Sequence, residues 1–276
     1  MIFCVLVASA DNRRDIFNIC FANSERIWAG CQWPRYVGLT TPQPDVYGFR
    51  VVTSPQMDWA AAVTDYINAL PADHRYILLM VEDVLFMRPV NNAMLNEISL
   101  AVANCNLDYV RLVPLRRSWF RRLTELLKPE LSNFLRYIRP TEPYFSSTEM
   151  VIWKREYLLE QLSHGDDAWS FEHRVTSRDH WAVGFPVFDQ HQIVQKGRWN
   201  WDAPRLLAKF LGYPQLAPEI TRILRRTRPF QTLAARLRGH RENISFALFG
   251  FTSFRVRRWL GQMFSILGIR GPLRHS

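Results

Sequence analysis

The sequence predicts an α/β fold with a mostly parallel central sheet, flanking helices and a basic helical C-terminal tail. First, short continuous apolar runs, typical of buried strands, alternate with segments of helical apolar spacing. Second, 48% of the 276 residues are hydrophobic, which is enough to bury a substantial core. Third, the basic residues concentrate near the end of the chain.

Short apolar runs bounded by polar or turn residues predict the strands. The clearest run is YILLMV at residues 76–81, which leads directly into two acids. The run at residues 2–8 ends in a polar segment that begins with Ser9. The expected strands are residues 2–8, 36–39, 49–52, 76–81, 109–113, 151–153 and 186–194.

Apolar residues at i, i+3 and i+4 predict the helices. Residues 58–70 show this spacing best, with Asp58 as N-cap and Pro71 as the residue that stops the helix. Asp166 or Asp167 can cap a further short helix, in which Trp169 is expected to pack inward. The other expected helices are residues 14–29, 91–104 and 154–162.

The charge distribution divides the chain into residues 1–204 and residues 205–276. The second part holds 14 Lys and Arg against two acids, whereas the first holds 21 basic and 23 acidic side chains. Within the tail, residues 253–267 place apolar side chains on one face of a helix, with Trp259 and Phe264 beside it and arginines flanking it. Such a basic amphipathic helix favours binding to an anionic membrane surface.

Other features predict a cytoplasmic protein that lies peripherally on the inner face of the cell membrane. No basic segment precedes the apolar residues 2–8, which argues against a signal peptide. Nowhere do 18 apolar residues follow one another, so no membrane-spanning helix is expected. The four cysteines form no CxxC pair, and we expect reduced, buried thiols, with Cys4 in a core strand.

Glu82 and Asp83 follow the most strand-like segment. Ligands of open α/β sheets bind beyond the carboxyl ends of the strands. A divalent cation held by a carboxylate there can stabilise a leaving diphosphate, and Mn²⁺ or Mg²⁺ needs only one or two protein carboxylates. Because neighbouring residues of an extended chain point to opposite sides, we select Asp83 as the metal ligand. The alternative interpretation is that both acids are simply exposed to solvent where the strand passes into a loop.

Glu172 is the candidate catalytic base. It lies in the first or second turn of the helix that Asp166 or Asp167 caps, where it could accept the proton of an attacking hydroxyl. An acid favoured by the helix dipole is the alternative interpretation.

The remaining candidates are single residues. His191, in the last expected strand, could approach the metal or the diphosphate, although a lone His is more often structural. Ser9, Asp11 and Arg14 follow the first strand and are candidate contacts to the donor nucleotide, although polar residues of a solvated loop would give the same pattern. The sequence lacks a Gly-rich phosphate-binding fingerprint, which argues against dehydrogenases and P-loop enzymes. No Ser-His-Asp or nucleophilic Cys arrangement stands out either.

Five motifs occur in order over about the first 200 residues: DW at 58–59, YILLMVEDVLF at 76–86, YVRL at 109–112, YFSSTEMVIWKREYL at 144–158 and WSFE at 169–172. In these motifs the chain resembles a GT-A-like glycosyltransferase family found in bacterial polysaccharide and lipopolysaccharide biosynthesis clusters. The resemblance implies a Rossmann-like nucleotide-sugar fold, with Asp83 and Glu82 at the metal and diphosphate site and Glu172 as base. The chain departs from the usual Asp-x-Asp pattern, since Val84 and Leu85 follow Asp83.

The leading hypothesis is a glycosyltransferase that moves a sugar from a nucleotide-sugar donor to a hydroxyl of a lipid-linked glycan. Two other classes stay open. One is a nucleic-acid-binding protein, because 13 of the 14 basic residues in the tail are Arg. The near-neutral charge of residues 1–204 and the apolar face of the tail helix argue against it. The other is a non-catalytic, membrane-associated assembly factor with a transferase fold.

Overall fold

The computed structural model describes residues 2–9, 14–114, 130–132, 135–142, 145–162, 167–185, 187–195, 198–200, 203–210, 217–218 and 220–221. The strands are β1 (Phe3–Ala8), β2 (Arg35–Leu39), β3 (Arg50–Thr53), β4 (Tyr76–Val81), β5 (Val84–Phe86), β6 (Tyr109–Arg111), β7 (Glu130–Ser132), β8 (Leu135–Ile138), β9 (Val151–Lys154), β10 (His180–Val183), β11 (Gln190–Gln192), β12 (Val194–Gln195) and β13 (Arg198–Trp199). The helices are α1 (Arg14–Ile27), α2 (Trp59–Ala69), α3 (Asn92–Asn104), α5 (Arg155–Leu162), α6 (Ala168–His173) and α7 (Ala203–Ala208).

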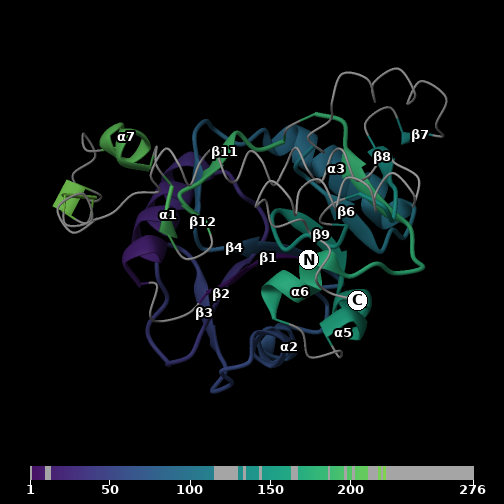
Figure 1. Cartoon of the computed structure of the whole chain (residues 1–276), viewed down its shortest axis with the longest axis horizontal. Helices are drawn as coiled ribbons and strands as arrows, with labels where there is room; N and C mark the ends of the chain where they lie inside the picture. Colours follow the sequence, from purple (N-terminus) through teal and green to yellow (C-terminus); the bar gives the residue numbers. More distant parts are fainter. Residues whose placement is uncertain are drawn as a thin grey trace, which may run out of the picture.

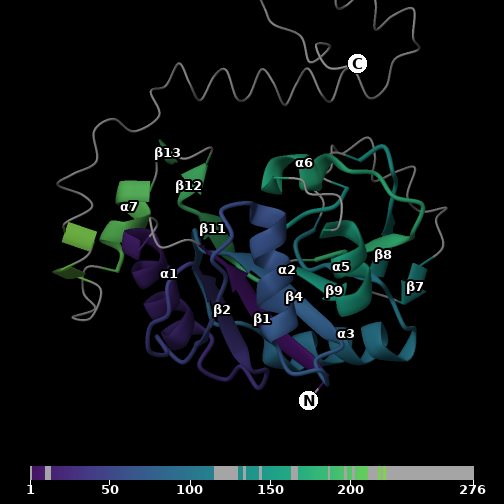
Figure 2. The ribbon, with the colours of Figure 1, turned by 90° about the horizontal axis from the view of Figure 1, so that it is seen from below.

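A nine-stranded sheet forms the centre of the described part of the chain, in the order β3-β2-β1-β4-β9-β6-β10-β8-β7. Strands β3, β2, β1 and β4 pair in parallel, whereas β9 is antiparallel to both β4 and β6. Of the nine strands described in this sheet, seven run in one direction, whereas β8 and β9 run in the other. Figures 1 and 2 show helices on both faces of this sheet. The predicted α/β class with a mostly parallel central sheet is therefore confirmed.

Alternating side chains of the central strands divide the core into two layers. On β1, Phe3, Val5 and Val7 face α1 and α3, whereas Cys4 and Leu6 face α2 and α5. The sequence periodicity of these strands and helices had indicated this burial. As predicted, Asp58 caps α2, and its side chain accepts a hydrogen bond from the N–H of Ala61 at 2.9 Å.

The short strand β5 is held from both sides, although no sequence pattern had predicted it. On one side it pairs antiparallel with β11. On the other, Asn23 of α1, which is fully buried, replaces a neighbouring strand: its Oδ1 accepts from the N–H of Phe86 at 2.8 Å, and its Nδ2 donates to the Phe86 carbonyl at 3.2 Å. Because β5 follows Asp83 directly, Asn23 also fixes the chain beyond that carboxylate.

Asn23→Ala is expected to lower the free energy of unfolding by about 2–4 kcal/mol, because it leaves a buried N–H and a buried carbonyl of Phe86 without partners. Urea denaturation monitored by circular dichroism measures the change. Asn68→Ala, at an exposed position of α2, is the matched control and should change stability by less than about 1 kcal/mol. Equal effects of the two substitutions would contradict the role given to Asn23.

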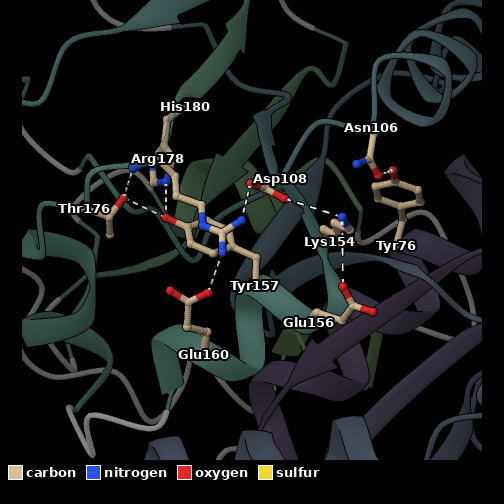
Figure 3. Close-up of polar contacts among 10 residues, drawn as sticks. All are labelled: Tyr76, Asn106, Asp108, Lys154, Glu156, Tyr157, Glu160, Thr176, Arg178 and His180. Atoms are coloured by element: carbon tan, nitrogen blue, oxygen red, sulfur yellow. Dashed lines mark hydrogen bonds and ion pairs between the residues drawn. The ribbon is translucent and has the colours of Figure 1, made fainter.

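A neutral histidine lies at the centre of the second layer. His180 is fully buried and stacks between Tyr109, with ring centroids 3.9 Å apart, and Phe145, with centroids 4.1 Å apart. Its Nδ1 lies 3.0 Å from the Phe145 carbonyl, which can only accept, so Nδ1 carries the proton. Its Nε2 then accepts from the Tyr157 hydroxyl at 2.9 Å (Figure 3). Burial lowers the pKa of His180 to about 4.

This depressed pKa predicts acid sensitivity. The unfolded chain takes up a proton on His180 near pH 6.5, whereas the folded chain does so only near pH 4. Above pH 6.5 the histidine is neutral in both states, and the free energy of unfolding is not reduced. As the pH falls from 6.5 towards 4, protonation of the unfolded chain lowers the free energy of unfolding, by roughly 3 kcal/mol at most. Urea unfolding at pH 7.5, 6 and 5 should show a shallower pH dependence for His180→Gln. The control His173→Gln, at an exposed position, should keep the slope of the wild type.

A group of charged side chains surrounds the amino end of β10. Arg178 bonds Asp108 at 2.8 Å and Glu160 at 2.9 Å, and Lys154 lies 3.9 Å from Asp108 (Figure 3). Asp108 precedes β6 and Lys154 ends β9, so the group lies at the edge of the sheet where the parallel strands begin. It ties strand ends together at the edge opposite to the one expected for ligands.

Two sequence predictions are corrected by the structure. The expected strand at residues 186–194 is instead β11, which pairs with β5 outside the central sheet, followed by β12, which pairs with β13. Its polar core, Gln-His-Gln, is only partly buried, which is unlike a strand of the central sheet. Cys4 and Cys20 are buried thiols as expected, but Cys105 is exposed.

The first residues of the predicted tail pack against helix α1. Leu207, Phe210 and Ile220 are buried in a third apolar cluster together with Ile16 and Ile19 of α1. The predicted boundary after residue 204 falls inside α7, and the division into two domains stays a prediction. The amphipathic segment 253–267 lies outside the described residues.

Candidate active site

The order of the strands identifies one edge of the sheet as the place for a ligand. From β1 the chain continues to β2 and β3 on one side, and then returns to β4 on the other side of β1. At such a reversal the loops after the two neighbouring strands diverge, and a crevice for ligands opens at their carboxyl ends. Ala8 of β1 lies opposite Val81 of β4, so Ser9 and Glu82 are the next residues at this edge.

Asp83 is a buried carboxylate at this edge. It lies in the two-residue turn between β4 and β5, and only 8% of its surface is exposed. Its two carboxylate oxygens lie 3.2 and 3.4 Å from Nε2 of Gln192. Its carbonyl accepts from the N–H of Ile193 at 2.8 Å. One segment distant in sequence, Gln192 and Ile193, therefore holds both the side chain and the carbonyl of Asp83.

Strand β11 separates the two predicted metal ligands. Gln192 reaches Asp83, and the neighbouring residue of a strand points to the opposite face. That residue is His191, which is paired with Leu85. The side chain of Leu85 packs against α1 in the third apolar cluster. A contribution of His191 to a cation beside Asp83 thus stays a prediction.

Ser9 is a second feature of the edge. Its N–H donates to the Gly38 carbonyl at 3.3 Å, which extends the pairing of β1 and β2 by one residue. Its hydroxyl is buried, and it has no hydrogen-bond partner among the described residues. A buried hydroxyl without a partner is costly, which is compatible with a ligand contact. The other two candidates cannot be placed: Asp11 lies outside the described residues, and the structure describes only the backbone of Arg14, at the start of α1.

Glu172 lies on α6, which Asp167 caps by accepting a hydrogen bond from the N–H of Ser170 at 2.6 Å. The capping bonds lower the pKa of Asp167. Oε1 of Glu172 accepts from both the N–H of Thr148, at 2.9 Å, and its hydroxyl, at 2.7 Å. Thr148 is buried in the segment that leads into β9. The predicted inward packing of Trp169 is wrong: its side chain is 48% exposed, and Phe171 fills the core instead.

Glu149 also belongs to this edge, and sequence reasoning did not select it. Leu79 of β4 lies opposite Val151 of β9 in antiparallel pairing, so residue 149 comes beside the end of β4. Its Oε1 accepts from Nε2 of Gln190 on β11 at 2.6 Å. A strand prediction for residues 151–153 could not find Glu149, because nothing in the sequence indicates that β9 lies between β4 and β6.

The donors at this edge fit a hard cation of the Mg²⁺ type. The described residues contain no group of three or more His, Cys, Asp or Glu arranged to hold a metal. Mg²⁺ and Mn²⁺ accept one or two protein carboxylates when phosphates and water complete the shell, and buried Asp83 supplies such a ligand.

The nearby cysteine is unsuited to nucleophilic catalysis. Cys20 of α1 is buried near both acids, and burial, followed by the charges of Asp83 and Glu82, raises the pKa of its thiol well above the usual range. The thiol therefore stays protonated near neutral pH.

None of the helices within the described ranges has both the length and the apolar character that a membrane span requires. No known family model matches the chain, and no curated protein is significantly similar in sequence.

Solved structures show distant likenesses. Residues 1–349 of TarS from S. aureus share 10% identity with the chain at a TM-score of 0.44, over 83% of this chain and 73% of that one. The longer TarS structure gives a TM-score of 0.43 and 10% identity, with 44% of its length covered. A mycobacterial protein gives a TM-score of 0.34 and 14% identity, over 76% of this chain and 74% of that one. Likenesses of this degree do not assign the chain to a family.

Proposed function

We propose that the chain is a glycosyltransferase that uses a nucleotide-sugar donor. One observation carries the proposal: a buried carboxylate, Asp83, lies at the carboxyl end of β4, beside the point where the strand order reverses. An α/β sheet binds a nucleotide at such a point. Transfer of a sugar also builds negative charge on the leaving diphosphate, which a cation held by a carboxylate neutralises.

In the donor half of the proposed site, Ser9, Asp11 and Arg14 contact the nucleotide or its phosphates from the end of β1 and the start of α1. Asp83, with Glu82 beside it, holds Mn²⁺ or Mg²⁺, and His191 is the second predicted ligand. The cation, when bound, stabilises the charge of the departing diphosphate. Gln192 orients the Asp83 carboxylate through its amide N–H groups.

In the acceptor half, a carboxylate has to take the proton of the attacking hydroxyl, and Glu172 is proposed for this role. The two hydrogen bonds from Thr148 fix the orientation of its carboxylate on α6. The proposed acceptor is a lipid-linked glycan of a cell-surface polysaccharide. Such an acceptor fits a protein that lies on the inner face of the cell membrane.

A screen of thermal stability against nucleoside diphosphates, with and without Mn²⁺, tests this proposal. A ligand at 100 times its Kd stabilises the folded protein by about 2.7 kcal/mol, which raises the melting temperature by several degrees. We expect one nucleoside diphosphate to stabilise the chain, and Mn²⁺ to increase the shift. If no member of the panel shifts the melting temperature, the proposed function is wrong.

We propose that the tail binds anionic membranes. A truncation that tests this has to keep Leu207, Phe210 and Ile220, because these side chains are buried against α1. A chain ending at residue 221 keeps these side chains and loses most of the basic excess. It should still bind nucleotide, but it should no longer sediment with anionic vesicles, because each basic residue near such a surface contributes about 1 kcal/mol. High salt should release the full chain only partly, since insertion of Trp259 and Phe264 does not depend on salt.

The same preparations test the two alternative functions. Salt-dependent binding of the full chain to oligonucleotides, without binding to vesicles, would favour a nucleic-acid-binding protein. Vesicle binding without any binding of nucleotides would favour a non-catalytic assembly factor.

A further inference from the structure

We propose that Trp169 is the platform on which a sugar ring of the acceptor stacks, beside the candidate base Glu172. The ligand is a neutral pyranose whose C–H face lies against the exposed surface of the indole. The inference rests on the proposed function, because it needs an acceptor that brings a hydroxyl to Glu172.

Trp169 is exposed, although Trp side chains are mostly buried in folded proteins. Its side chain is 48% exposed, and it is the one aromatic among the large hydrophobic residues exposed in the described ranges. Phe171 holds α6 on the core instead, with its ring centroid 5.2 Å from that of Trp59 and 5.6 Å from that of Trp153. Packing of α6 therefore does not account for an indole at position 169.

Helix α6 lies at the edge of the sheet where ligands are expected. Glu172 bonds Thr148, which precedes β9, and β9 runs antiparallel to β4. The start of β9 is therefore at the carboxyl end of β4, where Asp83 also lies. Figure 2 agrees with this, since it shows α6 on the side of the sheet opposite the N-terminus.

The spacing of Trp169 and Glu172 suits one sugar ring. They are three residues apart in α6, so their Cβ atoms are about 5–6 Å apart on the same part of the helix surface, which is comparable with the width of a pyranose. Both hydrogen bonds from Thr148 go to Oε1 of Glu172, and Oε2 makes none with the described residues. A hydroxyl of a ring stacked on Trp169 is thus offered Oε2 as its acceptor.

The indole is held in one orientation. The ring of His173, one turn further along α6, lies with its centroid 4.6 Å from that of Trp169 at an angle of 38°. A side chain that is already ordered loses little conformational entropy when a ligand binds. Stacking needs exposed ring surface rather than an enclosed cavity or an unpaired polar atom, and ring surface is present at this position.

The surroundings of the indole favour a neutral sugar over a lipid surface. A pyranose has C–H groups on its ring face and hydroxyl groups around its rim, so an apolar plane bordered by polar groups complements it. Ser170, beside Trp169, is exposed, and so is the capping residue Asp167. The capping bonds lower the pKa of Asp167, so its carboxylate is ionised at neutral pH. This charge disfavours an anionic membrane and an acidic sugar.

The test uses the full chain, saturated with the nucleoside diphosphate that gives the largest thermal shift. The probes are the neutral disaccharides cellobiose, lactose, chitobiose and maltose. Saturation-transfer NMR reports which C–H protons of a disaccharide contact the protein, and a titration gives its Kd. We expect a member of the panel to bind through the C–H protons of one ring face.

Trp169→Ala should raise the Kd of this disaccharide by about tenfold or more, because stacking removes apolar surface of both partners from water. The Kd of the nucleoside diphosphate should stay within about twofold. Trp169→Phe keeps a flat ring and should raise the Kd of the disaccharide by only about threefold. Trp169→Leu keeps an apolar side chain without a flat ring, and it should behave like Trp169→Ala.

The matched control is Leu100→Ala, which removes an exposed apolar side chain from α3 and should leave both Kd values unchanged. Melting temperatures establish that each variant is folded. If Trp169→Ala does not fold, Trp169→Leu decides in its place.

The platform is overturned if no disaccharide of the panel binds, or if the folded Ala and Leu variants bind the disaccharide as the wild type does. Weaker sedimentation of Trp169→Ala with anionic vesicles, at unchanged disaccharide binding, would make the indole a membrane contact and would also overturn it. Failure of the proposed function looks different: the wild-type chain then binds no nucleoside diphosphate, and the platform falls with it.

Discussion

Asp83→Asn is expected to lower kcat for sugar transfer by about 10²- to 10³-fold while the fold stays intact. Asparagine keeps the shape of the side chain and one oxygen that can accept from Nε2 of Gln192. It loses the charge that holds a cation against the diphosphate, so the Mn²⁺-dependent part of the thermal shift with nucleoside diphosphate should disappear as well. Transfer assays with the donor selected by the thermal screen measure both effects.

The control for this variant is Asp73→Asn. Asp73 is exposed at the opposite edge of the sheet, before β4, and its substitution should change neither kcat nor the Mn²⁺-dependent shift. Circular dichroism and the melting temperature without ligand show that both variants fold. Full turnover by folded Asp83→Asn would remove Asp83 from the reaction and would leave it as a buried acid of the β4–β5 turn.

The elements predicted well are those whose burial follows a simple period. Residues 76–81 are an unbroken apolar run because β4 is covered on both faces, and they form the strand as predicted. In α2, Val63 and Ile67 face the core at helical spacing, and Asp58 caps the first turn. Asp83 could be selected because its position after β4 follows from the same local pattern. Local periodicity and capping thus account for the α/β class and for one side chain of the candidate site.

The features that were not predicted depend on contacts between distant segments. Strand β5 has only three residues, and its edges are satisfied by Asn23, which is 63 residues away, and by β11. Glu149 reaches the candidate site because β9 lies between β4 and β6. The sequence of residues 151–154 predicts a strand, but it does not indicate which strands pair with it. Gln190 was missed for a related reason, since a polar strand such as β11 has no apolar pattern.

Glu172→Gln is expected to lower kcat by about 10²- to 10⁴-fold while nucleotide binding persists, because a base acts on the acceptor hydroxyl. The amide oxygen of Gln can still accept both hydrogen bonds from Thr148, so α6 should keep its contact with the segment before β9. What the variant loses is the ability to take a proton.

Thr148→Val distinguishes a catalytic role of Glu172 from a structural role in holding the segment before β9. It removes the 2.7 Å bond between the Thr148 hydroxyl and Oε1 of Glu172, but it keeps the bond from the backbone N–H and the carboxylate itself. If Glu172 is the base, Thr148→Val should lower kcat far less than Glu172→Gln does. If Glu172 only supports the segment before β9, the two variants should instead lose stability and activity to similar, small extents. A fall in nucleotide affinity with Glu172→Gln would place this carboxylate in the donor site or in the fold, and the base would then have to be another residue.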